Sequence, residues 1–280
     1  MSKEELIQDI NKHAPWYQCI DFPEYGITTT DNEQNIFKDN AYDSYLDGYS
    51  LEEATKLRPM PKWNNIKKFI NMDDFKDQEI LEIGSNCGFF SFEFNKLGAK
   101  NVTGLELKGS GCDHHYKCSL MALKYLKYTN VNFVGCDFML YDRYKYQSSP
   151  GLLSCDNYSI HLPSNQFDTI FSSTVIDHSF FPIIYIYKTL KMARKVVYLD
   201  LVVCDEMFKD EYHKTIRLGV SEDPIKYPHH GYSFSLDSII FILQRLGIKR
   251  EDITYNKYGN GDHVLLRIDT TNLNRFLIGA

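Results

Sequence analysis

The sequence predicts an α/β fold: a doubly wound, mostly parallel sheet of seven strands with an antiparallel last strand, preceded by an N-terminal helical extension. Three observations carry this prediction. From residue 79 onward, short apolar runs alternate with segments of helical periodicity, which is typical of a parallel sheet with helices on both faces. A glycine-containing turn, residues 84–88, joins the first apolar run to the helix that follows it. Near the end of the chain, Asn260-Gly261 separates two apolar runs and predicts a hairpin, so the last strand runs antiparallel.

Each element follows from a local pattern. The expected strands, in chain order, are residues 79–84, 102–107, 131–136, 167–172, 195–203, 253–257 and 263–268. Residues 195–203 are apolar at nearly every position, as expected of a central parallel strand that is buried on both faces. Helices are expected at about 112–127 and 183–193, and an earlier one ends at Gly98, which stands just past its last turn. Ser235 is expected to cap a final helix whose apolar residues recur every three or four positions.

Residues 1–75 lack this alternation. They are expected to form an aromatic-rich extension or lid, with the main domain spanning residues 76–280. Ser2 and Glu5 have the spacing of a capping box for a first helix, and a short helix is expected at 63–70. The aromatic residues of the extension include Trp16, Tyr17, Phe22, Tyr25, Tyr42, Tyr45 and Tyr49. Packing of these side chains onto the main domain is favoured over contact with a ligand.

The composition bounds the class of protein. With 280 residues, 43% hydrophobic and 24% charged, the chain is globular with a sizeable core, which excludes disordered and collagen-like classes. A formal net charge of −6 does not favour an electrostatic nucleic-acid surface. No uncharged run reaches the ~18 residues that a membrane-spanning helix needs, and the charged N-terminus has no apolar secretory core. Seven cysteines without a C-x-x-C pair indicate reduced thiols, so a cytoplasmic location is expected.

The turn after the first strand has the clearest chemical meaning. Residues 82–88 read Glu-Ile-Gly-Ser-Asn-Cys-Gly, and glycines there let the backbone pass close to a ligand beside the N–H groups of a helix terminus. Glu106 ends the second strand, where an acid accepts hydrogen bonds from a ribose diol. The spacing G-x-G-x-x-G is absent, and a carboxylate at Glu82 repels phosphate, so a pyrophosphate ligand is disfavoured. Glu82 instead suits an amino group or a sulfonium.

Four segments carry a family resemblance. Residues 79–107 match the pattern acidic-h-G-x-x-x-G and its continuation, and Cys136-Asp137-Phe138 resembles a stretch that contacts adenine. Residues 162–170 resemble an LP-x-x-x-x-FD-h-h fourth strand, and residues 174–178 fall where a loop ending in His is common. Taken together and in this order, they resemble the class I S-adenosylmethionine-dependent methyltransferases, which have a Rossmann-like fold. The likeness covers about residues 76–270.

Two departures and a narrower likeness qualify this resemblance. Ser85-Asn86-Cys87 stands where many relatives have a more glycine-rich turn, although small residues still fit there. No N/D-P-P-Y/F segment follows the fourth strand, so the resemblance does not point to methylation of base amino groups. Residues 16–23 together with Trp63 are weakly similar to the wobble-uridine tRNA carboxymethyltransferase-like group and its uncharacterised relatives.

The resemblance implies S-adenosylmethionine as the cofactor and assigns roles to individual residues. The cofactor-binding residues are expected to be Glu82, Gly84, Ser85, Asn86, Gly88, Glu106, Leu107, Asp137, Phe138 and Ser173. His178, with Asp177 nearby, is the candidate that takes up a proton from the acceptor. Contacts with the substrate are expected from Trp16, Tyr17, Tyr25, His229 and His230. No resident metal is expected.

The acceptor and the reaction leave alternatives open. An O or N acceptor on a small molecule or glycan precursor is favoured, because the acidic balance disfavours RNA. The alternatives are a tRNA-modifying methyl or carboxymethyl transferase, an NAD-dependent oxidoreductase and a non-catalytic binding protein on the same fold. No membrane partner is expected, and the sequence does not indicate the oligomeric state.

Two other groups of residues invite a metal interpretation. Cys112, His114, His115 and Cys118 have zinc-ligand chemistry. They are not expected to form a zinc site, because four residues so spaced on one helix cannot all converge on a tetrahedral ion. Asp177, Asp200 and Asp205 are an alternative magnesium site, although Asp200 lies in the middle of a strand. Residues 108–111, Lys-Gly-Ser-Gly, are expected to be a flexible turn in preference to a phosphate nest.

Overall fold

The structure, a computed structural model, describes residues 1–36, 49–107, 113–141, 164–179, 181–203, 216–219, 231–259 and 261–273. The chain divides into two compact units, residues 1–141 and 142–280. Each unit contributes strands to one seven-stranded sheet.

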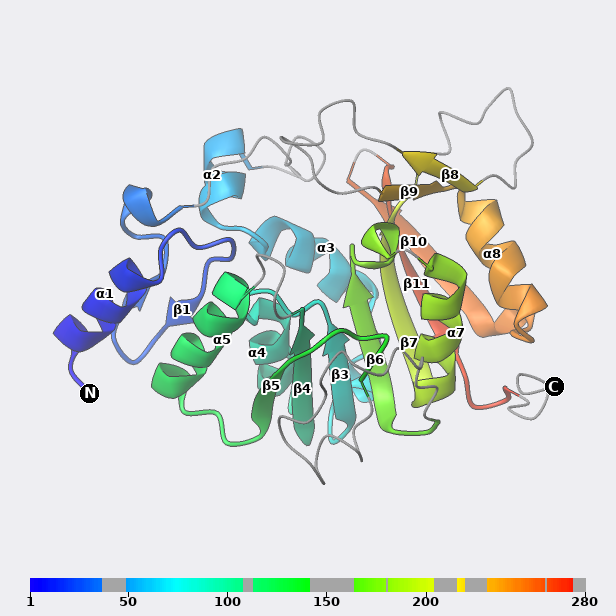
Figure 1. Cartoon of the computed structure of the whole chain (residues 1–280), viewed down its shortest axis with the longest axis horizontal. Helices are drawn as coiled ribbons and strands as arrows, with labels where there is room; N and C mark the ends of the chain where they lie inside the picture. Colours follow the sequence, from blue (N-terminus) through cyan, green and yellow to red (C-terminus); the bar gives the residue numbers. More distant parts are fainter. Residues whose placement is uncertain are drawn as a thin grey trace. The chain divides into compact units, whose positions relative to one another are not determined.

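The sheet has the strand order β10-β11-β7-β6-β3-β4-β5 (Figure 1). β3, β4 and β5 belong to the first unit and pair in parallel. In the second unit β6 and β7 are also parallel, whereas β11 runs antiparallel to both β7 and β10. The expected fold is therefore confirmed: a mostly parallel, doubly wound sheet with an antiparallel last strand.

The first unit begins with the extension and continues through three strands and two helices of the sheet. Its elements are α1 (Lys3–Lys12), β1 (Asp21–Phe22), β2 (Ile27–Thr28), η1 (Glu33–Asn35), α2 (Leu51–Lys56), α3 (Met60–Phe69), η3 (Met72–Asp74), β3 (Glu79–Ile83), α4 (Phe89–Lys96), β4 (Asn101–Glu106), α5 (Asp113–Leu126) and β5 (Val131–Gly135).

The second unit completes the sheet. Its elements are β6 (Phe167–Ser173), η4 (Ile176–His178), α7 (Pro182–Met192), β7 (Ala193–Val202), β8 (Ile216–Gly219), β9 (Gly231–Phe234), α8 (Leu236–Arg245), η6 (Arg250–Asp252), β10 (Ile253–Tyr258) and β11 (His263–Asp269). The expected strands thus fall within two residues of the observed ones.

Aromatic packing fills the core of the first unit. Phe75 stacks on Phe94 of α4 with ring centroids 4.9 Å apart, and Trp63 of α3 meets Phe90 and Phe94 edge-on. All four of these rings are buried. Such edge-to-face and offset contacts add to the hydrophobic stabilisation of the buried area.

In the second unit the apolar strand β7 is buried from Val196 to Leu201, as its composition predicts. Ser235 caps α8 by accepting a hydrogen bond from the Ser238 N–H. The short pair β8 and β9 was not expected. No strand was expected between residues 203 and 253, but Gly231–Phe234 forms β9. This strand escapes prediction because it is four residues long, starts with glycine and lacks a clear alternation.

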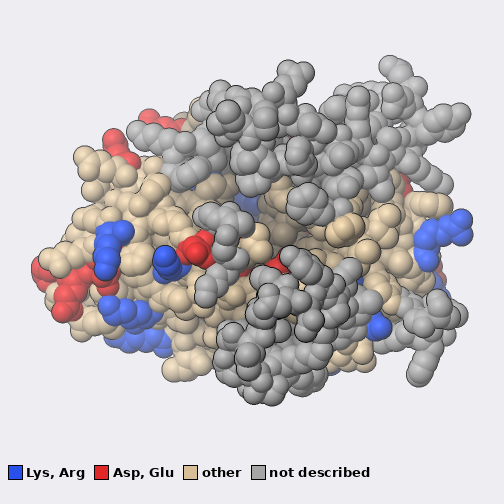
Figure 2. All heavy atoms as spheres, in the orientation of Figure 1, with Lys and Arg blue, Asp and Glu red and all other residues tan. Residues whose placement is uncertain are grey.

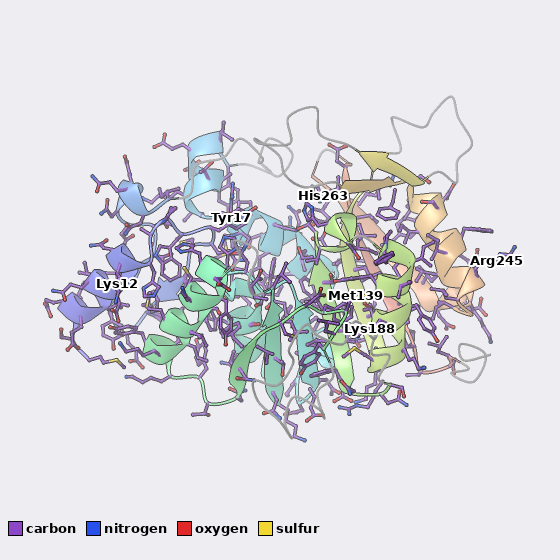
Figure 3. All side chains as sticks on the ribbon, in the orientation of Figure 1. Lys12, Tyr17, Met139, Lys188, Arg245 and His263 are labelled. Carbon is purple, nitrogen blue, oxygen red and sulfur yellow. The ribbon has the colours of Figure 1, made fainter. Side chains whose placement is uncertain are left out.

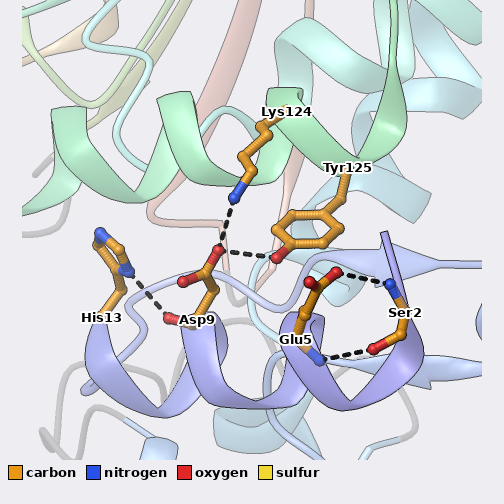
Figure 4. A network of polar contacts seen from close by, with 6 residues as sticks. All are labelled: Ser2, Glu5, Asp9, His13, Lys124 and Tyr125. Carbon is orange, nitrogen blue, oxygen red and sulfur yellow. Dashed lines mark hydrogen bonds and ion pairs between the residues drawn. The ribbon is translucent and has the colours of Figure 1, made fainter.

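Helix α1 forms with the expected capping box: Ser2 and Glu5 each accept a hydrogen bond from the other's backbone N–H. One turn further on, the Asp9 carboxylate accepts from Lys124 Nζ at 2.9 Å and from Tyr125 Oη at 2.7 Å, both on α5 (Figure 4). These contacts fasten the start of the extension to a helix more than a hundred residues later in the chain.

The described surface carries charges of both signs. In Figure 2 acidic and basic side chains lie close together at the end of the molecule where Figure 1 places α1, with uncharged surface around them. Among the described helices, none is both long enough and apolar enough to cross a bilayer.

The Asp9 contacts make a prediction about stability. Hydrogen bonds from Lys124 and Tyr125 lower the pKa of Asp9, so its contribution is present above the unfolded-state value and is lost as pH falls through the folded-state value. We expect Asp9→Asn to reduce the unfolding free energy by about 1 kcal/mol at pH 7, measured by urea denaturation. The difference from the wild type should shrink toward pH 3. A difference that does not change with pH would contradict the assignment.

Candidate functional site

The turn between β3 and α4 has a left-handed backbone conformation that few residue types adopt without strain. Gly84 and Gly88 have φ angles of +75° and +95°, and Asn86 between them has +51°. The N–H groups of Gly84 and Ser85 donate to the Leu105 carbonyl at 2.9 and 2.8 Å. Glycine adopts such angles without strain, and asparagine tolerates them better than most residues. The glycine spacing of the sequence is therefore a consequence of this left-handed backbone.

Steric contact also explains why glycine is present at two positions. A Cβ atom on Gly88 would lie 2.6 Å from the Phe133 ring, and one on Gly104 of β4 would also lie 2.6 Å from that ring. Gly104 pairs with Glu82 across the β3–β4 ladder. Gly104 is not recognisable from the sequence, because nothing local shows that Phe133 of β5 fills this space.

Two carboxyl groups are buried beside the turn. The Glu82 side chain is 1% exposed and accepts a hydrogen bond from Ser91 Oγ on α4. Glu106 is 7% exposed, and its Oε2 accepts from the Asn86 N–H at 2.5 Å. Burial raises the pKa of Glu82 to about 8, with Glu106 adding to the effect, and burial raises that of Glu106 to about 7. Both acids thus hold a proton more tightly than an exposed carboxyl does, and a cationic or hydrogen-bond-donating ligand would favour their charged forms.

Ser85 Oγ is buried and has no hydrogen-bond partner in the described part of the chain. A buried hydroxyl without a partner costs about 1–3 kcal/mol. The turn therefore holds one polar atom that a ligand could satisfy.

The extension reaches the same turn. Gln18 is 5% exposed, and its Oε1 accepts a hydrogen bond from the N–H of Phe89, the first residue of α4, at 3.0 Å. This side chain satisfies one of the N–H groups that a helix leaves free at its start. Sequence reasoning missed Gln18, since the partners are 71 residues apart and no spacing rule links them.

Further residues expected to bind the cofactor follow β4 and β5, and those after β5 are the expected adenine contacts. Leu107 is 40% exposed, and Phe138 is buried. Asp137 is exposed, and its Oδ1 accepts from the Met139 N–H at 2.8 Å. The Cys136 N–H donates to the Glu106 carbonyl at 2.9 Å, which ties the ends of the two strands together.

The three aromatic residues expected to line a substrate wall differ in their surroundings. Trp16 is 1% exposed, and its indole N–H donates to the Ile10 carbonyl at 3.0 Å, so it packs inside the extension. Tyr25 meets Tyr125 edge-on at 6.1 Å. Tyr17, labelled in Figure 3, is half-buried. Core packing, the interpretation favoured for these aromatics as a group, fits Trp16 best.

In the second unit, a polar network surrounds a wholly buried carboxylate on β7. Ser173 Oγ, at the end of β6, donates to Asp200 Oδ2 at 2.7 Å, and Tyr258 Oη donates to Asp200 Oδ1. His263 lies against the Tyr258 ring with centroids 5.4 Å apart. Ser173 uses its proton on Asp200, so its hydroxyl oxygen can still accept a hydrogen bond.

The remaining expected residues are placed only in part. His178 ends η4, and its side chain is exposed. The backbone of Asp177 is described but its side chain is not, and His229, His230, Asp205, Cys112 and residues 108–111 lie outside the described residues. The roles assigned to these residues stay predictions.

The two metal interpretations fall partly outside the described residues. Among the described residues, no group of three or more His, Cys, Asp or Glu side chains could hold an ion. His114 Nε2 lies 2.8 Å from the Pro15 carbonyl, and the Cys118 thiol donates to the His13 carbonyl at 3.5 Å. These two side chains join α5 to the extension.

Comparison with solved structures identifies the fold. The N-terminal domain of EvdMO1, crystallised in the presence of SAH and D-fucose, superposes with a TM-score of 0.62 at 13% identity over 96% of this chain and 97% of that one. An S-adenosylmethionine-dependent methyltransferase from Mesorhizobium loti gives a TM-score of 0.52 at 12% identity, over 74% of this chain and 97% of that one. The chain has this methyltransferase fold. No family model matches its sequence.

The two raised pKa values predict how stability depends on pH. The folded state keeps a proton on Glu82 up to about pH 8, whereas the unfolded chain releases it near 4.5, so the stability of the ligand-free protein falls as pH rises between these values. Glu82→Gln cannot ionise and retains an oxygen for the Ser91 hydroxyl. We expect the variant to gain stability relative to the wild type from pH 5 to pH 8, measured by urea denaturation. Parallel pH curves for the two proteins would refute the burial of an ionisable Glu82.

Proposed function

We propose that this protein is an S-adenosylmethionine-dependent methyltransferase that acts on an O or N acceptor. The observation that carries the proposal is the turn of residues 84–88 with Glu82 and Glu106 buried beside it, in a chain that has a methyltransferase fold. The turn lets a ligand come close to the backbone beside two acids. Its sequence does not have the glycine spacing G-x-G-x-x-G that is typical of phosphate binding.

The residues present fit this cofactor. Glu106 spends one oxygen on the Asn86 N–H and keeps further lone pairs for a ribose diol. Glu82 is placed to balance a positive charge, and Ser85 Oγ has no hydrogen-bond partner among the described residues. Gly84 and Gly88 give the turn the positive φ angles that bring its backbone round. Leu107, Asp137, Phe138 and Ser173 complete the proposed set, with the apolar side chains suited to an adenine ring.

The chemistry follows from what such a site has to do. When bound, the cofactor supplies an electrophilic methyl group on a sulfonium, which is a good leaving group. The protein then positions the acceptor, excludes water and takes up a proton where the acceptor is O–H or N–H. His178, with Asp177, is the residue that the sequence puts forward for that proton.

A small molecule or glycan precursor is the proposed acceptor. The net charge of −6 supports it over RNA, and the EvdMO1 domain was crystallised in the presence of a sugar. The alternatives are a tRNA-modifying enzyme, an NAD-dependent oxidoreductase and a non-catalytic binding protein.

Cofactor binding is tested by calorimetry with S-adenosylhomocysteine. Glu106→Ala removes charge-assisted hydrogen bonds, so we expect affinity to fall by about 1.5–3 kcal/mol, or roughly 10–150-fold. Gly84→Val should abolish binding, because a β-branched residue at φ +75° distorts the turn. Glu93→Gln is the matched control, since that carboxylate pairs with Lys96 on α4. Binding of NAD with no binding of S-adenosylhomocysteine would instead support the oxidoreductase.

The acceptor class is tested by transfer of a labelled methyl group. Wild-type protein is incubated with labelled S-adenosylmethionine and either D-fucose and related sugars or bulk unmodified tRNA. We expect label in the sugar fraction and none in tRNA. Label in tRNA alone would favour the tRNA-modifying alternative. Cofactor binding without label in either the sugar or the tRNA fraction would favour a binding protein.

A further inference from the structure

The ionisable side chains described beside the turn of residues 84–88 are acids, which suit only part of the proposed cofactor. Glu82 and Glu106 suit the amino group, the sulfonium and the ribose hydroxyls. The amino-acid portion of the same molecule also carries a carboxylate. An anion taken out of water next to two acids requires a cation or several hydrogen-bond donors.

A buried cation lies in the extension. Arg58, between α2 and α3, is 1% exposed. Its guanidinium carbon stands 4.4 Å from the centroid of the Tyr17 ring, which is the geometry of a cation–π contact. Its planar group presents paired N–H donors that match both oxygens of a carboxylate.

Residues 17–19 connect this arginine to the glycine turn. The Cys19 N–H donates to the Arg58 carbonyl at 2.5 Å. Gln18 accepts from the Phe89 N–H at the start of α4. Cys87, inside the turn, lies against the backbone of Tyr17 and Gln18. Three consecutive residues of the extension, 17–19, therefore contact both the turn and Arg58.

His115, an aromatic neighbour of Tyr17, carries no competing charge. The His115 ring lies 5.6 Å from the Tyr17 ring, and burial, with His114 adding to it, lowers its pKa to about 4. His115 is thus neutral at working pH. Of the two side chains that contact the Tyr17 ring here, Arg58 carries the permanent positive charge.

We infer that Arg58, oriented by the face of Tyr17, binds the carboxylate of the cofactor's amino-acid portion, so that the N-terminal extension completes the cofactor site. This inference rests on the proposed function. It gives Tyr17, expected from the sequence to contact the acceptor, a positioning role toward the cofactor.

The test compares two ligands that differ by one group. Calorimetry measures S-adenosylhomocysteine and decarboxylated S-adenosylhomocysteine with the full chain. We expect the wild type to prefer the carboxylate form by about 10–100-fold. Arg58→Gln should remove that preference by weakening S-adenosylhomocysteine alone, with less than a twofold change for the decarboxylated ligand. Arg58→Lys should keep part of the preference, since it retains the charge without the paired donors.

Lys62→Gln is the matched control, because Lys62 is another buried cation of the extension, on α3. It should leave the preference unchanged, and thermal unfolding of each variant checks that the fold is intact. A wild type that does not distinguish the two ligands, or an Arg58→Gln protein that keeps the full preference, would overturn the inference. A wild type that binds neither ligand would instead overturn the proposed function.

Discussion

The conformation of five residues after the first strand of the sheet is the constraint on which the rest of the site depends. Gly84, Asn86 and Gly88 all have positive φ angles, and Phe133 closes the space behind Gly88. The backbone can therefore turn sharply out of a buried strand and into α4 only with small residues. Because β3 and β4 are parallel neighbours in register, the same turn lies beside the end of β4 and so beside Glu106. Sheet pairing and turn geometry together bring the two acids to one place.

The N-terminal extension is tied to the rest of the first unit by contacts with α4 and α5. Asp9 joins α1 to α5, Trp16 is wholly buried, and Gln18 satisfies the first N–H of α4. A buried amide that both caps a helix and borders the turn costs free energy if it is withdrawn, since the Phe89 N–H would lose its partner. The order of the extension and the order of the turn are for this reason linked physically, whatever ligand the turn receives.

The parts that could be predicted from the sequence are those encoded by neighbouring residues. Strand periodicity, the Ser235 cap and the glycine turn each depend on a few consecutive positions, so the fold and the central acids followed from them. Gln18 with Phe89, and Tyr17 with Arg58, depend on residues tens of positions apart that no local pattern connects. Trp16 shows a different limit of sequence analysis. An aromatic residue outside the regular strand and helix pattern looks the same in the sequence whether it packs in a core or lines a binding site. The strand pair β8 and β9 was missed because four residues are too few to show a period.

The raised pKa values of the two acids give the turn a further property. Burial raises the pKa of both Glu82 and Glu106, so in the ligand-free protein each acid keeps its proton to a higher pH than an exposed carboxyl does. A neutral ligand without donors gains nothing from ionising them. A ligand that brings a positive charge to Glu82 and hydroxyl donors to Glu106 stabilises the charged forms that burial disfavours. Binding of such a ligand therefore releases protons from the two acids. The two acids therefore favour a ligand that carries a positive charge and hydroxyl donors, and the role proposed for the buried Arg58 is to meet an anionic group of the same ligand.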